Sequence, residues 1–360
     1  MTGAPLKIRG IKARAVAAPM KRPLATSTGT VGEAALLLID LETDAGLTGR
    51  TYLFGLGRHN LPPIARLVEA MAEMVKGDEV APLDIERKLR AKYTLLGVHN
   101  VVLFAMSGID MAAWDALAQA QGLPLARLLG AAPRPIPAYN SNGLGILPVK
   151  ELEREAVELL EEGFRAIKLR LGRQDASQDM DALRAVKRAI GSGIVLMVDF
   201  NQGLTVAEAI RRGRMIDAEG GVAWIEEPVR ADDFAGCARI AREVATPIQI
   251  GENFMGPEQM AQALAAGACD YVMPDAQRIG GVTGWLRAAA LAQAAGVEMS
   301  SHLFPEVSAH LLTATPTCHW LEFVDWAGPI LEQPLRVKDG FVFPQEKPAW
   351  NENAVQKYLL

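Results

Sequence analysis

From about residue 135 onward, short apolar segments alternate with longer amphipathic ones, and this alternation most constrains the fold of the chain. Segments 149–162 and 176–190 repeat their hydrophobic residues at the 3.6-residue period of a helix. The shorter segments are almost entirely apolar, which is typical of parallel strands that helices cover on both faces. We expect eight strands, at 136–141, 166–171, 194–200, 223–226, 247–252, 271–274, 297–301 and 320–323.

Eight such units in fewer than 200 residues predict an α/β fold, a modified TIM-type (β/α) barrel over residues 131–324. The rival is a doubly wound sheet, which usually has fewer strands and a glycine-rich first turn. The nearest match to that turn, at 55–60, lacks the third glycine and does not begin a helix. The barrel is therefore the favoured architecture.

Residues 1–130 have a different organisation, with strands first and helices after them, which indicates a separate α+β domain. We expect strands at 7–17, 34–43 and 48–54, and helices at 61–74, 83–95 and 101–121. The tail, residues 325–360, contains a predicted hairpin at 335–343. We expect this tail to fold back onto the N-terminal domain and complete it.

Composition excludes several classes of protein. The net charge of -5, without a basic cluster, argues against nucleic acid or an anionic membrane as the main partner. No signal-peptide core is visible, and no stretch approaches the ~20 apolar residues of a membrane span. The three cysteines have no metal-ligand spacing, which favours free thiols in a reducing compartment. We therefore expect a cytoplasmic protein.

Polar residues stand at the ends of seven of the predicted strands. In a barrel of this type the active site lies at the C-terminal ends of the strands. The steps between successive residues are 20 to 31, which is about one β-α unit each. All seven should therefore project into one mouth: Lys168, Asp199, Glu226, Glu252, Asp275, His302 and Glu322.

Three of these residues are carboxylates on consecutive strands, namely Asp199, Glu226 and Glu252. One carboxylate after a strand is more often a helix cap or a surface charge. Three crowded together would repel one another, and a hard divalent cation with oxygen ligands removes that repulsion. With no cysteine or paired histidine nearby, the pattern favours Mg²⁺ or Mn²⁺ over Zn²⁺.

The remaining polar residues indicate proton transfer. A lone histidine in an apolar strand is usually a core residue, but Asp275 can orient His302 as a general base. Lys168 and Arg170 share one face of their strand and need anionic partners, which the three carboxylates and a substrate carboxylate would provide. This set suits removal of a proton alpha to a carboxylate. Glu322 could donate a proton to the resulting enediolate if burial keeps it protonated.

At this point the sequence resembles the enolase superfamily, and within it the mandelate racemase subgroup. The resemblance covers essentially the whole chain and rests on the stretches GIDMAAWDAL, AIKLRLG, VDFNQ, WIEEP, GENFMGPEQM, MPDAQRIGGVTGW and SSHLFPEVSAHLLTATPTCHWLE. It implies a capping domain on a modified barrel, a homo-oligomer, and a small carboxylic acid as substrate. It also implies Mg²⁺ on Asp199, Glu226 and Glu252.

The same resemblance implies roles for the other residues. His302 with Asp275 would be one acid/base, and Glu322 the electrophilic donor to the substrate carboxylate. Lys168 would contact that carboxylate. Ser141 and Asn201 would lie beside the bound substrate.

One departure from the family pattern changes the expected reaction. Mandelate racemase has a second lysine, the base for the opposite face of the substrate, where this chain has Arg170. Arginine is essentially always protonated and is a poor base. We therefore expect dehydration of a sugar acid with His302–Asp275 as the base. The alternatives are a racemase or epimerase of a 2-hydroxy acid and, from another class, a non-catalytic carboxylate-binding protein.

The composition of two loops in the N-terminal domain does not decide between two classes of substrate. Apolar residues there would suit an aromatic substrate: Leu24, Val31, Phe54 and Leu56. Polar residues there would suit a polyol acid: Thr26, Ser27, Thr28, Arg58, His59 and Asn60. A second change, Arg278 where the family motif has lysine, keeps the positive charge.

Overall fold

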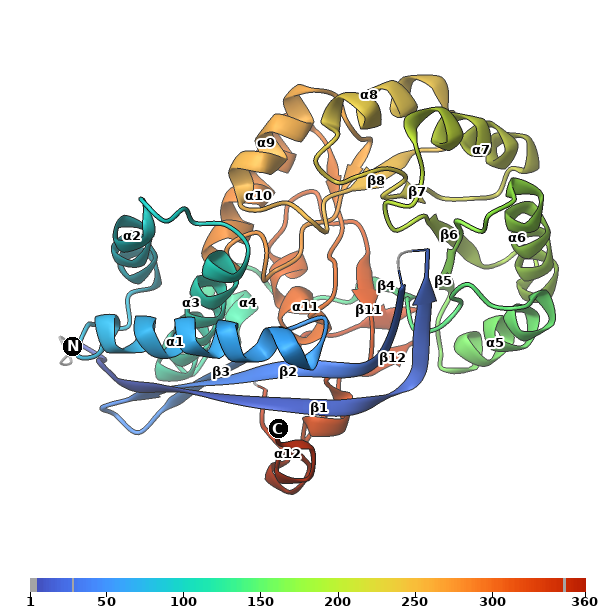
Figure 1. Cartoon of the computed structure of the whole chain (residues 1–360). Coiled ribbons are helices and arrows are strands. Elements are labelled where there is room, and N and C mark those ends of the chain that lie inside the picture. Colours follow the sequence, from blue (N-terminus) through green and yellow to red (C-terminus); the bar gives the residue numbers. More distant parts are fainter. Residues whose placement is uncertain (1–4, 28, 346–347) are drawn as a thin grey trace.

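The computed structural model describes residues 5–27, 29–345 and 348–360 and contains a closed barrel at its centre (Figure 1). Successive strands from β4 to β10 pair in parallel, β11 pairs in parallel with β4, and a bridge between Met299 and Cys318 completes the circle. The predicted modified (β/α) barrel is thus confirmed, since a doubly wound sheet would have open edges. Its strands are β4 (Ile136–Asn140), β5 (Ala166–Arg170), β6 (Val195–Asp199), β7 (Ile225–Glu226), β8 (Ile248–Ile250), β9 (Tyr271–Val272), β10 (Glu298–Met299) and β11 (Leu321–Phe323).

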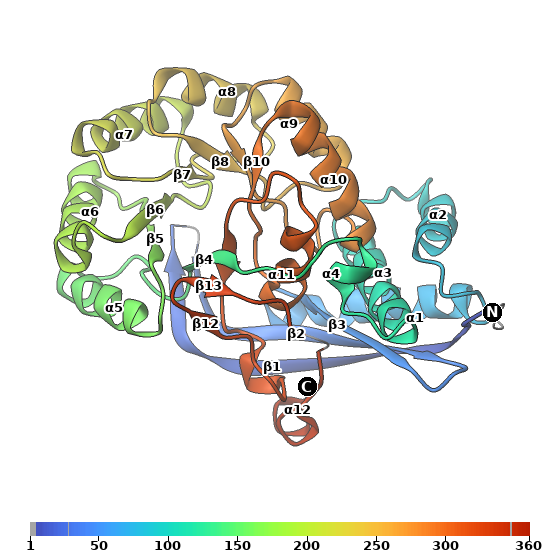
Figure 2. The same ribbon diagram turned by 180° about the vertical axis from the view of Figure 1, so that it is seen from behind.

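Amphipathic helices cover the outside of this barrel (Figure 2). In one of them Leu152, Ala156 and Leu159 are buried, at the spacing of a single helix face. Several strands are shorter than predicted; β8, for example, ends at Ile250, because the positive φ angle of Gly251 turns the chain out of the ladder. The helices are α5 (Val149–Glu161), α6 (Ala176–Ile190), α7 (Val206–Glu219), α8 (Phe234–Glu243), α9 (Pro257–Ala265), α10 (Gly281–Ala295) and α11 (Pro305–Thr313).

The N-terminal part is a three-stranded antiparallel sheet with helices beside it, as predicted for an α+β capping domain. Strand β1 runs well past its predicted end, through Pro19 and Pro23, because an edge strand tolerates missing N–H groups. The boundary at residue 130 stays a prediction. The elements are β1 (Ile8–Thr26), β2 (Gly29–Thr43), β3 (Thr48–Phe54), the 3₁₀ turn η1 (Arg58–Asn60), α1 (Leu61–Val75), α2 (Pro82–Tyr93), α3 (Val101–Ala120) and α4 (Leu125–Leu128).

Helix α3 corrects one expectation from the sequence. It has 20 residues and a hydropathy of 1.5, so by length and composition it could cross a membrane. However, 72% of its apolar window is buried inside the protein. Gly49 of β3 lies so close to Ala112 and Ala116 that a side chain there would clash, so the small residues of α3 serve close packing. We therefore interpret α3 as a core helix.

The C-terminal tail divides between the two parts of the molecule. Its hairpin, β12 (Val337–Lys338) and β13 (Phe341–Val342), pairs with β4 of the barrel and not with the capping sheet, contrary to the prediction. After the turn η2 (Gly328–Ile330) and the hairpin, α12 (Glu352–Tyr358) does reach the capping sheet beside β1 (Figure 1). Trp350 Nε1 donates to Asp40 of β2 at 2.8 Å.

Candidate active site

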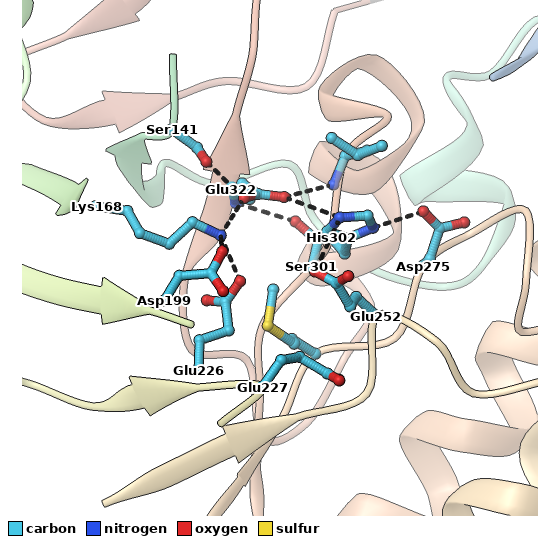
Figure 3. A network of polar contacts seen from close by, with 12 residues as sticks. Ser141, Lys168, Asp199, Glu226, Glu227, Glu252, Asp275, Ser301, His302 and Glu322 are labelled. Carbon is cyan, nitrogen blue, oxygen red and sulfur yellow. Dashed lines mark hydrogen bonds and ion pairs between the residues drawn. The ribbon is translucent and has the colours of Figure 1, made fainter. Parts of the chain in front are cut away.

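The seven predicted strand-end residues lie at the C-terminal mouth of the barrel (Figure 3). Lys168 is on β5, Asp199 and Glu226 end β6 and β7, and Glu322 is on β11. Glu252, Asp275 and His302 follow β8, β9 and β10 by two or three residues. The register explains this grouping, because Asp199 pairs with Glu226, and a parallel bridge joins Asp275 to His302. The strand spacing therefore predicted the gathering of these side chains correctly.

Lys168 is buried, and its ammonium group points at the carboxylates of Asp199, Glu226 and Glu322 (Figure 3). Its Nζ contacts Glu226, lies 2.7 Å from Glu322 Oε1, and lies 3.3 Å from Asp199 Oδ2. Burial alone would lower the pKa of this ammonium group, but the attraction of the three carboxylates outweighs it and raises the pKa. Lys168 thus stays charged and able to bind an anion.

The three predicted metal ligands lie close enough to repel one another. Burial raises the pKa of Glu226 well above its usual range, and repulsion from Asp199, Glu322 and Glu252 adds to this effect. In this conformation Glu226 turns to Lys168 and Glu252 to His302, so no three acidic, histidine or cysteine side chains within the described ranges converge tightly enough to hold an ion.

The donor set nevertheless fits a hard divalent cation in chemistry and charge. It consists of carboxylate oxygens alone, held on three adjacent strands, and an added positive charge would relieve their repulsion. To share one ion, Glu226 and Glu252 would have to turn away from Lys168 and His302. The assignment of these ligands stays a prediction.

His302 is oriented by Asp275. Its Nδ1 lies 2.7 Å from Asp275 Oδ2, so Nδ1 carries a proton toward Asp275, and its Nε2 faces Glu252 Oε2 at 3.3 Å. Asp275 is fixed in turn, because its Oδ1 accepts from the backbone N–H groups of Gln277 and Arg278. Burial lowers the pKa of His302, but Glu252 and Glu322 raise it more, to about 9. A cation bound by Glu252 would remove part of this elevation.

Glu322 accepts hydrogen bonds on both oxygens. Oε1 takes Lys168 Nζ and the Ser141 hydroxyl, each at 2.7 Å, and Oε2 takes the Leu303 N–H at 2.9 Å. Burial raises the pKa of Glu322, yet the positive charges of Lys168 and His302 outweigh burial and hold the pKa below its ordinary value. The expectation that burial keeps Glu322 protonated is therefore wrong for the free site. A donor role requires that Glu322 gain a proton when substrate binds.

Arg170 does not have the partners that were expected. It does not contact the carboxylates but donates to the backbone carbonyls of Ser141 and Gly143, at 2.8 and 2.9 Å, and to the Ser141 hydroxyl at 2.7 Å. Its charge is thus dispersed over backbone dipoles at the end of β4. A guanidinium held in this way has no free lone pair to accept a proton.

The two predicted substrate neighbours occupy different layers of the site. Ser141 is fully buried and lies behind Glu322, so it reaches the cavity only through that residue. Asn201 lines the cavity and binds Asp199 through both its backbone N–H and its side-chain amide. Its amide oxygen is buried and has no hydrogen-bond partner among the described residues.

A cavity of about 270 Å³ lies between these residues and the capping domain. Its polar lining includes Asn201, Gln202, Asn253 and Arg278, whereas its apolar lining comes largely from the cap: Leu24, Val31, Phe54, Leu56, Leu303 and Trp326. The larger hollows elsewhere are more open and contain none of the predicted site residues. The cavity therefore offers apolar side chains to an aromatic acid and polar side chains to a polyol acid.

The polar residues of the two capping loops lie in different places, some at the cavity and some at the surface. Thr26 lines the cavity, and Ser27 donates to the Phe200 carbonyl at 2.8 Å, fixing the hairpin tip to the barrel. Arg58 pairs with Glu33 at the surface, and Asn60 binds the Gly55 carbonyl. Thr28 lies outside the described residues.

Sequence reasoning missed two buried polar residues beside the site. Glu227 Oε1 accepts from Gly251 N–H at 2.9 Å, and burial raises the pKa of this carboxyl to about 8. It lies just past the end of β7 with a positive φ angle, so a search for one residue at each strand end passed over it. Gln277 binds the backbone of Phe54 and so ties the cap to the barrel. In the sequence, the position of Gln277 two residues after Asp275 was the feature that could have pointed to it.

Models of known families match both parts of the chain. The model described as mandelate racemase / muconate lactonizing enzyme, N-terminal domain, covers residues 8–130, and the model described as enolase C-terminal domain-like covers residues 151–348. The chain belongs to the mandelate racemase / muconate lactonizing enzyme family of the enolase superfamily. The resemblance noted in the sequence motifs is thereby confirmed.

Members of this family with known structure or activity align over most of the chain. An enolase from Bradyrhizobium, crystallised with magnesium and mandelic acid, is 45% identical over 100% of both chains, with a TM-score of 0.95. The L-talarate/galactarate dehydratase of Salmonella typhimurium is 32% identical over 93% of this chain and 85% of its own length. The 3,6-anhydro-alpha-L-galactonate cycloisomerase of Streptomyces coelicolor is 31% identical over 92% of each. The protein is therefore an enolase-superfamily enzyme, a lyase or an isomerase.

Proposed function

We propose that this enzyme removes the proton alpha to the carboxylate of a 2-hydroxy acid, and that it dehydrates a sugar acid. The observation that carries the proposal is the His302–Asp275 pair, which lines the same cavity as Lys168 and has its Nε2 beside Glu252. We assign Mg²⁺ to Asp199, Glu226 and Glu252, because relatives of this chain contain magnesium and these carboxylates need a cation. When bound, Mg²⁺ would neutralise negative charge that develops on the substrate carboxylate.

The residues of the chain then have the following roles. Lys168 binds the substrate carboxylate, which weakens its hold on Glu322 and raises the pKa of that carboxyl toward protonation. His302 Nε2 takes the alpha proton, and Asp275 stabilises the imidazolium. His302 then returns the proton to the beta hydroxyl, which leaves as water, and the enol product becomes a 2-keto-3-deoxy acid. Because Arg170 cannot serve as a base, proton transfer occurs on one face only.

Alpha-hydrogen exchange in D₂O tests this function. The protein would be incubated with Mg²⁺ and a panel of aldonic and aldaric acids and both mandelate enantiomers, followed by mass spectrometry. We expect 2-keto-3-deoxy products from a sugar acid and exchange at one configuration only. His302→Asn should abolish exchange without affecting Mg²⁺ binding, whereas His99→Asn, at an exposed position, should change nothing. Absence of exchange with every acid would favour the carboxylate-binding alternative.

A second function, racemisation of a 2-hydroxy acid with an aromatic or aliphatic substituent, is favoured by the apolar wall of the cavity. Phe54, Leu56 and Trp326 are unusual neighbours for a polyol, and the Bradyrhizobium relative was crystallised with mandelic acid. A racemase exchanges the alpha hydrogen of both enantiomers. The D₂O experiment therefore separates the two functions directly.

A further inference from the structure

Arg170 has an organised set of contacts that the proton-transfer chemistry does not explain. The side chain is 3% exposed, and its two terminal nitrogens make three hydrogen bonds to Ser141 and Gly143. Its backbone N–H donates to the Leu144 carbonyl at 2.9 Å. The arginine on β5 therefore holds the end of β4 and the turn that follows it.

The direction of the hydrogen bonds through Ser141 is fixed by chemistry. A guanidinium can only donate, so the Ser141 oxygen must accept from Arg170 Nη2. The single hydroxyl hydrogen is then left to point at Glu322 Oε1, 2.7 Å away. A neutral residue without this donor would leave the hydroxyl free to rotate and to accept elsewhere.

Ser141 also leaves Glu322 little freedom. Glu322 is fixed by three donors, namely the hydroxyl, Lys168 Nζ and the Leu303 N–H. Of these, Lys168 is the group that an incoming substrate carboxylate would engage. Once it does, Ser141 and Leu303 remain to hold Glu322 in place.

We propose that Arg170 is a positioning residue, which orients the Ser141 hydroxyl and through it holds Glu322 Oε1 toward the substrate carboxylate. The inference rests on the proposed function, in which Glu322 meets that carboxylate. It gives position 170 a role in the reaction that needs no transfer of a proton to or from arginine.

Arg212 offers a matched control for this role. It is 4% exposed, and like Arg170 it donates to a backbone carbonyl, that of Arg173, while it also binds Asp179 and Glu208 outside the site. Glutamine is the test substitution at both positions, because unlike lysine it cannot become a new base. Ser141→Ala removes the hydroxyl and leaves Arg170 bound to the backbone carbonyls.

The kinetic test uses alpha-hydrogen exchange of galactarate or mandelate, whichever the wild type turns over. We expect Arg170→Gln and Ser141→Ala each to lower kcat about 10- to 100-fold with KM changed less than about threefold, as for a slightly misplaced group. The double variant should be no worse than the more affected single one, since both break one chain of contacts. Arg212→Gln should lower Tm and leave kcat unchanged. Additive losses in the double variant would refute the proposal.

Crystal structures of the variants give an answer that is independent of activity. In Arg170→Gln we expect the Ser141 hydroxyl oxygen to lose its 2.7 Å contact with Glu322 Oε1, whereas in Arg212→Gln this contact should stay. An unchanged contact in Arg170→Gln would overturn the inference even if neither acid is turned over. Absence of exchange by the wild type would count only against the proposed function.

Discussion

At the scale of the residue, the contact between Asp275 Oδ2 and His302 Nδ1 decides which ring nitrogen can act as a base. Asp275→Asn keeps the size of the side chain, but its amide can donate to Nδ1 and so move the proton to Nε2. We expect alpha-hydrogen exchange to fall about 10²- to 10⁴-fold, as for loss of a general base. The control is Asp270→Asn at the opposite end of the same strand, where the carboxylate accepts from Ile248 N–H. Equal losses in both variants would contradict the assigned role.

At the residue scale, the sequence predicted which side chains form the candidate site but not all of their contacts. Asp199, Glu226 and His302 were found because parallel strands bring equally spaced residues to one rim. The partners of Arg170 could not be found in this way, since backbone carbonyls leave no mark in a residue pattern. The ionisation of Glu322 was also missed, because it depends on whether burial or the neighbouring charge of Lys168 is stronger.

At the scale of the element, Asp110 of α3 binds the first turn of α10. Its carboxylate accepts from the N–H of Thr283 at 3.0 Å and from the Thr283 hydroxyl, which accepts in turn from Trp114. The stretch GIDMAAWDAL thus contains a polar link to the barrel as well as small packing residues. Sequence indicated the packing and missed the link, which joins residues 173 positions apart.

This link makes stability depend on pH. Burial raises the pKa of Asp110 from 3.8 to about 7, so the folded protein binds a proton that the unfolded chain releases between these values. The free energy of unfolding should therefore fall as pH rises from 4 to 7, by at most about 4 kcal/mol from this group. Asp110→Asn should flatten that part of the urea-unfolding profile, whereas Asp84→Asn at an exposed position should not. A profile unchanged by Asp110→Asn would refute the effect.

At the same scale, the tip of the hairpin formed by β1 and β2 contacts the barrel at two points. Ser27 donates to the Phe200 carbonyl, and Ile146 N–H donates to the Ala25 carbonyl, each at 2.8 Å. Ser27→Ala removes one bond of about 0.5–1.5 kcal/mol, so KM should rise roughly 2- to 12-fold while kcat stays constant. Thr94→Ala, which removes a hydroxyl-to-carbonyl bond on α2, should leave both constants unchanged. A lower kcat with constant KM would argue against this role of the tip.

At the scale of the whole molecule, the active site requires both parts of the chain. The barrel supplies the charged residues, and the cap supplies most of the apolar wall and is held by Gln277 and Ser27. Hydrophobic period and strand count were enough to predict both parts, but not that the C-terminal hairpin joins β4. That hairpin is short and could pair with any free strand edge, so its period carries no information about its partner. The homo-oligomer and the cytoplasmic location stay predictions.

Metal binding should stabilise the whole molecule, since the carboxylates on β6, β7 and the segment after β8 belong to one cooperative barrel. At a Mg²⁺ concentration of 100 times Kd, a single site adds about 2.7 kcal/mol to the free energy of unfolding and raises Tm by a few degrees. Glu226→Gln should abolish this rise in Tm after prior treatment with a chelator.

The neighbouring carboxyl provides the control, because Glu227 has the same side chain and is equally buried but binds Gly251 N–H instead of Lys168. Glu227→Gln should retain the Mg²⁺-dependent rise in Tm. If instead the rise survives in Glu226→Gln and disappears in Glu227→Gln, then Glu227 holds the ion. In that case the assignment of ligands from mouth-facing strand positions is wrong.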